Sequence, residues 1–189
     1  MLPKIEPTGA YTDDEIDRTL AYRVLVHAEL EACIEQLVVQ TLTRSEQNWQ
    51  SDSMPRASLL ALVAYRDGQL SPQPKSILYP GSEQKPSPTL RERVKQARVD
   101  VCNKINNSNN GIREPNILGM LIPAGIGAYQ LERDWLEVID RFGERRGFTA
   151  HNGRVGMKNL PDPKVEREDT NKIVCGLRKI DALLTGLSE

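Results

Sequence analysis

The longest regular pattern of apolar residues in the chain predicts a long helix over residues 12–43. Thr12 and Glu15 have the spacing of a capping box, in which each side chain binds a backbone N–H at the start of a helix. After this cap, apolar residues recur every three or four positions, so they share one side of a helix that turns about 100° per residue. They are Ile16, Leu20, Val24, Leu30, Ile34, Leu37 and Val38.

Three polar residues lie within this apolar stripe. Arg23, His27 and Glu31 are spaced four apart and fall on the apolar side of the predicted helix. The first interpretation is a buried hydrogen-bond network, because a buried charge without a partner is costly. The alternative is that His27, with Arg23 and Glu31, lines a functional cleft.

The rest of the chain predicts shorter helices and one long loop. Helices are expected over Met54–Tyr65, from the capping box at Thr89 to Asn106, and over Trp135–Phe142, ending near Gly143. A last helix starts at Asp162-Pro163, an N-cap followed by proline at the first helical position.

The segment 66–88 carries five prolines with glycines and serines, a composition that neither helices nor central strands tolerate, so a loop is expected there. No segment shows the alternation of a strand. The sequence therefore predicts one all-α domain over residues 1–189, an up-and-down helical bundle with a Pro-rich loop insertion.

Composition limits the chemistry that one chain can carry. Its 189 residues contain two histidines and three cysteines, and the formal net charge is −1. Cys33, Cys102 and Cys175 lack the spacing of a zinc site or a disulfide framework, so we expect reduced, mostly buried thiols and no metal. The N-terminus lacks an apolar signal core and no stretch is apolar enough to span a membrane, so a soluble cytoplasmic protein is expected.

The small net charge hides a separation of charge along the chain. Residues 13–35 carry a net charge of −5, whereas residues 141–158 carry +4 beside one of the two histidines. Arginine suits phosphate binding, and histidine transfers protons near neutral pH. On composition alone, a solvated helix face or an ion-pair network is the first interpretation of the segment 141–158.

A family resemblance favours a functional interpretation of this segment. Arg146-x4-His151 resembles the R-x4–6-H motif of the HEPN superfamily, all-helical proteins of which many are metal-independent ribonucleases. The run LERDWLEVIDRFGERRGFTAH (131–151) is similar to the W-L…L-D-x-F-G-x-R-R-G-x-x-A-H run of the RiboL-PSP-HEPN branch. Three further segments resemble the same branch: YRVLVHAELE (22–31), NGIREPNIL (110–118) and GLRKIDALL (176–184).

The resemblance implies a reaction and roles for individual residues. RNA would be cut by attack of the neighbouring 2′-hydroxyl, which leaves a 2′,3′-cyclic phosphate, with no metal and no cofactor. His151 would transfer protons and Arg146 would orient the scissile phosphate and stabilise its charge. The chain departs from much of the superfamily at Gly147, where a polar residue is common; Asn152 or Glu144 could supply that contact. The remaining RNA-binding candidates are Arg145, Asn152, Arg154 and Lys158.

Helix geometry adds a constraint to the motif. Residues five apart on a regular helix point about 140° away from each other, so Arg146 and His151 would not meet on one phosphate. Either Gly147 loosens the helix or a second subunit completes the site. HEPN proteins dimerise with their motifs facing each other, and a two-fold pair would bring two copies of His151 to one cleft.

Two functions therefore remain open at the level of sequence. The first is an endoribonuclease acting as a toxin or antiphage effector, with RNA, a second copy of the chain and a cognate antitoxin or regulator as partners. The second is a catalytically inactive helical module that binds RNA, a nucleotide or another protein through the same surface.

Overall fold

The computed structural model describes residues 2–65, 88–152, 157 and 160–189, with the side chain of Asn152 excepted. Over these residues every element of regular secondary structure is a helix and none is a strand, which confirms the all-α prediction. The elements are α1 Asp13–Asp52, α2 Ala57–Ala64, α3 Leu90–Ser108, α4 Glu114–Leu121, the short 3-10 helix η1 Ala128–Gln130, α5 Arg133–Asn152 and α6 Pro163–Ser188. The predicted Pro-rich loop 66–88 falls almost wholly outside the described residues.

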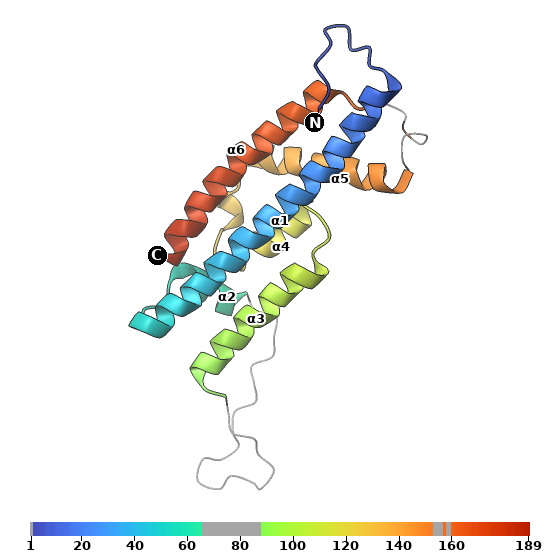
Figure 1. The fold of residues 1–189 in the computed structure, drawn as a ribbon. Coiled ribbons are helices and arrows are strands. Elements are labelled where there is room, and N and C mark those ends of the chain that lie inside the picture. Colours follow the sequence, from blue (N-terminus) through green and yellow to red (C-terminus); the bar gives the residue numbers. More distant parts are fainter. Residues whose placement is uncertain (1, 66–87, 153–156, 158–159) are drawn as a thin grey trace, which may run out of the picture.

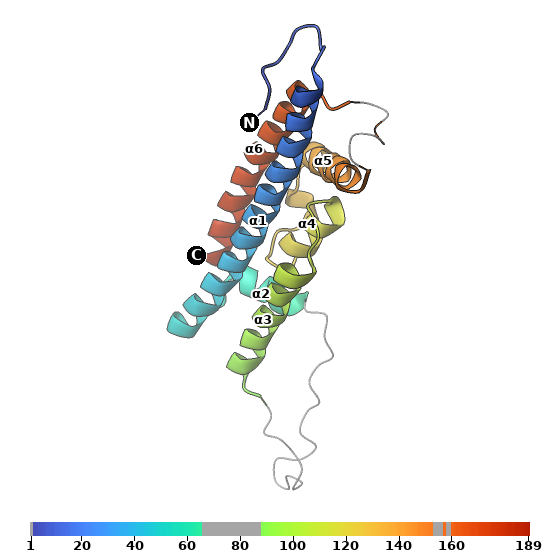
Figure 2. The ribbon, with the colours of Figure 1, turned by 45° about the vertical axis from the view of Figure 1, so that its right-hand side comes forward.

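Helix α1 lies beside both α6 and α3, and α5 lies across α1 and α6 (Figures 1 and 2). Helix α3 is antiparallel to α1, since Arg98 pairs with Glu46 and Asn109 binds Glu35. Helix α6 is parallel to α1, because Arg23 pairs with Glu166 near their N-terminal ends and Asn48 binds Ser188 near their C-terminal ends. The up-and-down order predicted from sequence therefore holds for α1 and α3 but not for α1 and α6.

Helix α1 is longer than the predicted 12–43. The capping box is present, with Thr12 and Glu15 each accepting from the other's backbone N–H. The helix continues to Asp52 because its buried face continues in polar residues: Ser45 binds Ser58 of α2, and Glu46 pairs with Arg98. A helix predicted from the apolar residues alone therefore ends before the observed C-terminus of α1.

Helix α5 corrects a second predicted boundary. It does not end near Gly143 but runs through Gly143 and Gly147 to Asn152. A glycine inside a helix costs only about 1 kcal/mol, and tertiary packing offsets it, since Phe142 and Thr149 on either side are buried. Glycine at position 143 is explained by packing, because a Cβ there would lie 3.1 Å from Cγ of Arg113.

Helix α4 was not predicted, because its eight residues are too short to show a period. Its N-terminus depends on a distant contact: Asp140 of α5 accepts from the backbone N–H of Glu114 at 3.0 Å and from Arg113 at 3.1 and 3.2 Å. Such a cap cannot be seen in the local sequence.

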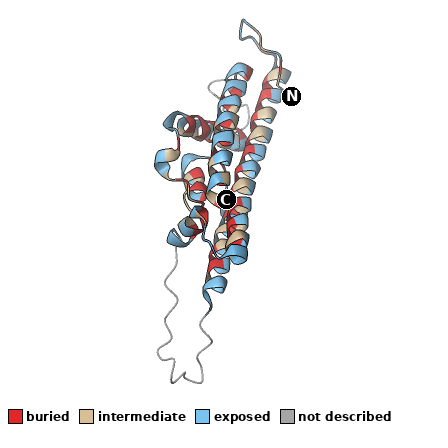
Figure 3. Ribbon diagram, turned by 90° about the vertical axis from the view of Figure 1, so that its left-hand side faces the viewer, coloured by how far each residue is buried: buried red, intermediate tan, exposed pale blue. Residues whose placement is uncertain are grey.

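The core follows the inward faces of the helices, as the red positions in Figure 3 show. Trp135 and Phe142 are buried there. The three thiols are unpaired, but the expectation that they are mostly buried is wrong, because only Cys102 is buried whereas Cys33 and Cys175 are exposed.

The contact between α5 and α6 depends on Gly176. The indole of Trp135 donates to the carbonyl of Ile173 at 3.1 Å and lies flat against α6, where a Cβ on Gly176 would come within 2.1 Å of its ring. Close approach of the two helices therefore requires glycine at this position.

We expect Gly176→Ala to lower the free energy of unfolding by about 1 to 3 kcal/mol, because the rigid indole must move to admit the methyl group. Gly186→Ala in the same helix is the matched control: nothing lies within 4 Å of its Cβ position, so alanine should be neutral or stabilise by up to about 1 kcal/mol. Urea unfolding of both variants measures the difference. Equal effects would contradict the packing role of Gly176.

Candidate active site

The four segments that resemble the HEPN branch meet in the folded chain. Residues 22–31 lie in α1, and residues 110–118 form the turn into α4 and its first half. Residues 131–151 cover all of α5 but its last residue, and residues 176–184 lie in α6. Direct contacts link them: His27 faces Gly111, Arg113 binds Asp140, and Trp135 packs on Gly176. Segments from both ends of the chain thus build one continuous structure along α5.

Arg146 lies on the side of α5 that faces α1. It is half-buried, and among the described residues its Nε has no hydrogen-bond partner. Its positive charge acts on two groups of α1, lowering the pKa of His27 and opposing the rise in the pKa of Glu31. Arg146 therefore joins the polar residues that interrupt the apolar stripe of α1.

His27 is only 1% exposed and lies between α5 and the turn after α3. Its ring stacks on Phe142 with centroids 6.5 Å apart, and its other edge faces Gly111. Gly111 has φ +126°, a conformation that favours glycine. Burial, followed by the charge of Arg146, lowers the pKa of His27 to about 4, so the ring is neutral at pH 7.

The predicted network of Arg23, His27 and Glu31 is divided in the structure. His27 Nδ1 lies 3.6 Å from Glu31 Oε2, beyond hydrogen-bond range, and has no partner among the described residues. Arg23 instead points toward α6. Arg23 is held in a buried hydrogen-bond network, but with Thr149 and Glu166 and not with His27 as the first interpretation had it, and His27 is buried without being fully paired.

Glu31 forms a separate polar cluster with the turn after α3. It accepts from the backbone N–H of Gly111 and from Asn109 Nδ2 at 3.3 Å, and Asn109 also binds Glu35 at 2.8 Å. Burial raises the pKa of Glu31, and the neighbouring charge of Glu35 adds to this effect. The cluster fixes the turn that places Gly111 against His27.

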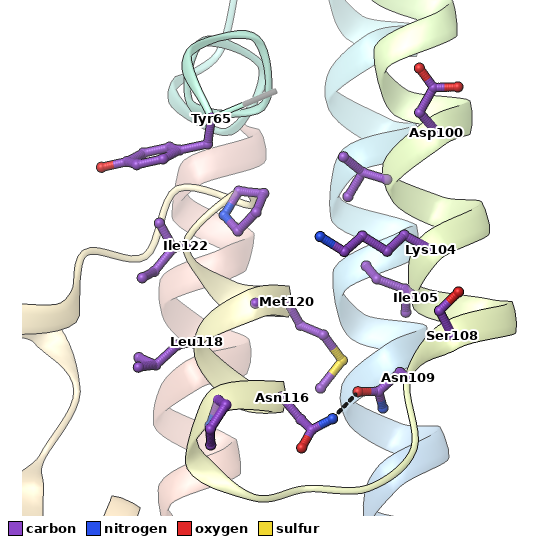
Figure 4. A pocket seen from close by; sticks show the side chains of 14 residues that line it. Tyr65, Asp100, Lys104, Ile105, Ser108, Asn109, Asn116, Leu118, Met120 and Ile122 are labelled. Atoms are coloured by element: carbon purple, nitrogen blue, oxygen red, sulfur yellow. Dashed lines mark hydrogen bonds between the residues drawn. The ribbon is translucent and has the colours of Figure 1, made fainter. Parts of the chain in front are cut away.

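A groove of about 550 Å³ opens on the far side of this cluster, between α3 and α4 (Figure 4). Ile105 and Met120 point into it from opposite helices. One end is closed by the hydrogen bond from Asn116 to Asn109, 3.0 Å long, so the groove adjoins the Glu31 cluster through Asn109.

The basic residues of α5 on the opposite side are neutralised by α6. Arg23 donates to Thr149 at 2.9 Å and to Glu166 at 2.7 Å, and both Arg23 and Glu166 are buried. Arg145 pairs with Asp169 at 2.7 Å and lies 3.3 Å from Glu166, while Arg141 also reaches Asp169. For Arg141 and Arg145, the ion-pair interpretation of the basic segment is confirmed.

His151 lies in the last turn of α5, and its side chain is exposed. Residues 146–151 are regular helix, so Gly147 does not loosen it, and Arg146 and His151 point apart. Glu144 is exposed. Arg154, Lys158 and the side chain of Asn152 lie outside the described residues. Within one chain, therefore, the two motif residues do not converge on one point.

The sequence did not reveal the acidic partners of the arginines, Glu166 and Asp169 on α6. It also did not reveal the role of the Asn109 amide on the turn after α3. Glu166 and Asp169 lie in register with the apolar residues Ile173 and Leu177, a pattern that indicates buried carboxylates in need of cations. Nothing in the local sequence distinguishes Asn109 from the other asparagines near it.

Within the described part of the chain, no group of three or more His, Cys, Asp or Glu side chains is arranged to hold a metal ion. No described helix is both long and apolar enough to cross a membrane.

Comparison with known proteins gives no relative: no family model matches the chain, and no curated protein or solved structure matches it.

Acid should destabilise the protein through His27. Between pH 6.5 and about 4 the unfolded chain binds a proton at His27 that the folded chain does not, so the free energy of unfolding falls as the pH drops through this window, by about 3 kcal/mol. Urea unfolding at several pH values measures the fall.

His27→Gln, which cannot titrate, is the control. Glu31 is present in both proteins, so the difference between them isolates His27. Wild-type and variant curves that stay parallel from pH 7 to 4 would contradict the assignment.

Proposed function

We propose that the chain is a metal-independent endoribonuclease of HEPN type, which cleaves RNA by attack of a 2′-hydroxyl to leave a 2′,3′-cyclic phosphate. The observation that carries the proposal is that the four segments similar to the RiboL-PSP-HEPN branch contact one another along α5, the helix that carries Arg146 and His151. These segments are far apart in the sequence, and all of them resemble the same family branch. Their contact in the folded chain is expected if they form one functional unit.

The proposed chemistry needs one base, one acid and one group that binds the phosphate. His151 removes the proton from the 2′-hydroxyl, whose oxygen forms a new bond to phosphorus while the bond to the 5′-oxygen breaks. A protonated second histidine returns a proton to the leaving 5′-oxygen. Arg146 stabilises the negative charge on the phosphate oxygens, which increases in the transition state.

The site requires a second copy of the chain. Arg146 faces α1 while His151 is exposed at the end of α5, so a phosphate bound at one is out of reach of the other within one chain. A two-fold pair that packs the ends of both α5 helices together would place His151 of one copy beside Arg146 of the other. It would also supply the second histidine.

RNA contacts extend from this cleft along the basic segment. Asn152, Arg154 and Lys158 follow His151 directly and would bind the flanking phosphates. Arg145, which is held by Glu166 and Asp169, contributes chiefly by positioning the helix. Such an enzyme would act in the cytoplasm as a toxin or antiphage effector, restrained by a cognate antitoxin or other regulator.

One observation favours the second function, a catalytically inactive helical module that binds RNA, a nucleotide or a protein. Arg146 and His151 diverge in the single chain and Gly147 offers no side chain between them. The two functions differ in whether RNA is cut.

Purified protein should cleave structured RNA and tRNA in the presence of EDTA, and Arg146→Ala and His151→Ala should each reduce the rate by about 100-fold or more, as loss of a proton-transfer group or an anion-stabilising group does. Arg133→Ala, on the exposed first turn of the same helix, is the matched control for loss of positive charge. Equal cleavage by all four proteins would contradict the assignment. RNA binding without cleavage, weakening steeply with salt, would favour the inactive module.

Mixing the wild type with a double variant, Arg146→Ala and His151→Ala in one chain, tests the shared cleft. In a mixed dimer each cleft lacks either Arg146 or a His151, so after random exchange of equal amounts only the wild-type pairs, about a quarter of all dimers, should remain active. About half of the wild-type activity, with exchange of subunits shown by mass spectrometry, would place both residues in one chain. Light scattering provides the dimer mass.

A further inference from the structure

Helix α2 is apolar on every side, although one side of it faces solvent. Its sequence, ASLLALVA, contains no charged residue, and its one polar side chain, Ser58, is buried. Leu59 and Leu62 pack in the core, whereas Leu60 is 58% exposed and Val63 52%. A helix that is apolar all round is normally buried all round. The outer face of α2 is therefore suited to a contact that the described part of one chain does not supply.

Further exposed apolar side chains lie on the segments around α2. Met54 precedes α2, Tyr65 follows it, and Leu90 begins α3, which packs against α2; all three residues are more than half exposed. Tyr65 also lies at the end of the α3–α4 groove far from Asn109 (Figure 4). Adjoining exposed apolar residues are rare on a monomer and typical of a surface that binds another protein.

The outer face of α2 is complementary to a second copy of itself. We call it the α2 face: Ala57, Leu60, Val63 and Ala64, all of them exposed. When two α2 helices lie antiparallel about a two-fold axis near Leu60, each Leu60 lies between Ala57 and Ala64 of the other copy, a large side chain over small ones. A contact of this kind places a surface against its own copy, so a charged face would repel itself. The α2 face carries no charge and meets this condition.

The two ends of the helix are also complementary. Arg56 directly precedes α2, where Asp52 binds its guanidinium at 2.7 Å, and the exposed Tyr65 directly follows α2. An antiparallel pair brings Arg56 of each copy to the Tyr65 end of the other, and a guanidinium over an aromatic ring is a favourable cation–π contact. A parallel pair would instead bring the two copies of Arg56 together, so the ends favour the antiparallel arrangement.

We propose that α2 is a contact between two copies of the chain, formed by antiparallel pairing of their α2 faces about a two-fold axis. The contact is separate from the cleft of the proposed function. Ser58 of α2 binds Ser45 of α1. Thr149, near the end of α5, binds Arg23, which lies about 33 Å from Ser45 along α1. The inference therefore goes beyond the proposed function and does not depend on it. Where the ends of α5 also pair, two separate two-fold contacts on one chain join dimers into an assembly of at least four copies.

The first test is the mass of the full chain in solution, measured by light scattering at micromolar concentration. Leu60→Glu places like charges at the axis, so we expect it to reduce the mass by half or more, to two copies where the ends of α5 pair and to one copy where they do not. Leu25→Glu is the matched control and should keep the wild-type mass, because Leu25 is 66% exposed on α1 and lies outside the α2 face. Circular dichroism checks that both variants are folded. A folded Leu60→Glu variant with the wild-type mass would overturn the contact.

The second test reverses the charge on one copy. Leu60→Lys should fail to pair with itself, as Leu60→Glu does. An equal mixture of the two variants should reach at least twice the mass of either alone, because opposite charges then meet at the axis, and high salt should weaken this assembly. A mixture that keeps the mass of its components would overturn the two-fold arrangement.

RNA cleavage separates this inference from the proposed function. Because α2 is remote from Arg146 and His151, Leu60→Glu should cleave RNA at the wild-type rate. Cleavage by the wild type, with no change of mass in Leu60→Glu, would overturn the α2 contact alone. Association that Leu60→Glu abolishes, without cleavage by the wild type, would support the α2 contact and overturn the ribonuclease alone.

Discussion

The buried ion pair between Arg23 and Glu166 is the interaction on which the functional end of the molecule depends. Two charges removed from water need close partners, and here Thr149 and Arg145 complete the arrangement. Because these four residues come from α1, α5 and α6, the arrangement fixes the last two turns of α5 against both long helices. The direction of Arg146 toward α1, and of His151 toward solvent, follows from this placement.

This network also determines how much of the basic charge would remain for the phosphate that the proposed function requires. The acidic N-terminal half of α1 and the basic end of α5 are separated in sequence but are neighbours in the fold. Arg141 and Arg145 are neutralised by Asp169 and Glu166, whereas Arg146 faces His27 and Glu31. The positive charge available to a ligand is therefore smaller than the count of arginines suggests, and it is concentrated at the end of the helix.

How much could be predicted from sequence depended on whether the signal was local. The capping boxes at Thr12 and Thr89, the start of α6 at Asp162 and the polar residues within the stripe of α1 all depend on spacing within one helix, and the structure has each of them. The full length of α5, the existence of α4 and the pairing of Arg145 depend on tertiary contacts of Asp140, Gly143 and Asp169. A pattern read along the chain contains no information on those contacts.

The same distinction bears on what the resemblance to the HEPN branch means. Asp140 caps α4, and the lack of a side chain at Gly143 and Gly176 leaves room for Arg113 and Trp135. Much of the sequence pattern that resembles the branch therefore maintains packing and carries no chemistry. Arg146 is different, because its half-buried guanidinium lies beside a neutral histidine and a carboxylate of raised pKa, and packing alone does not require a charge there. The attraction between Arg146 and Glu31 is a stabilising contact within the bundle, and the proposed function gives the same guanidinium a second role, the binding of the RNA phosphate.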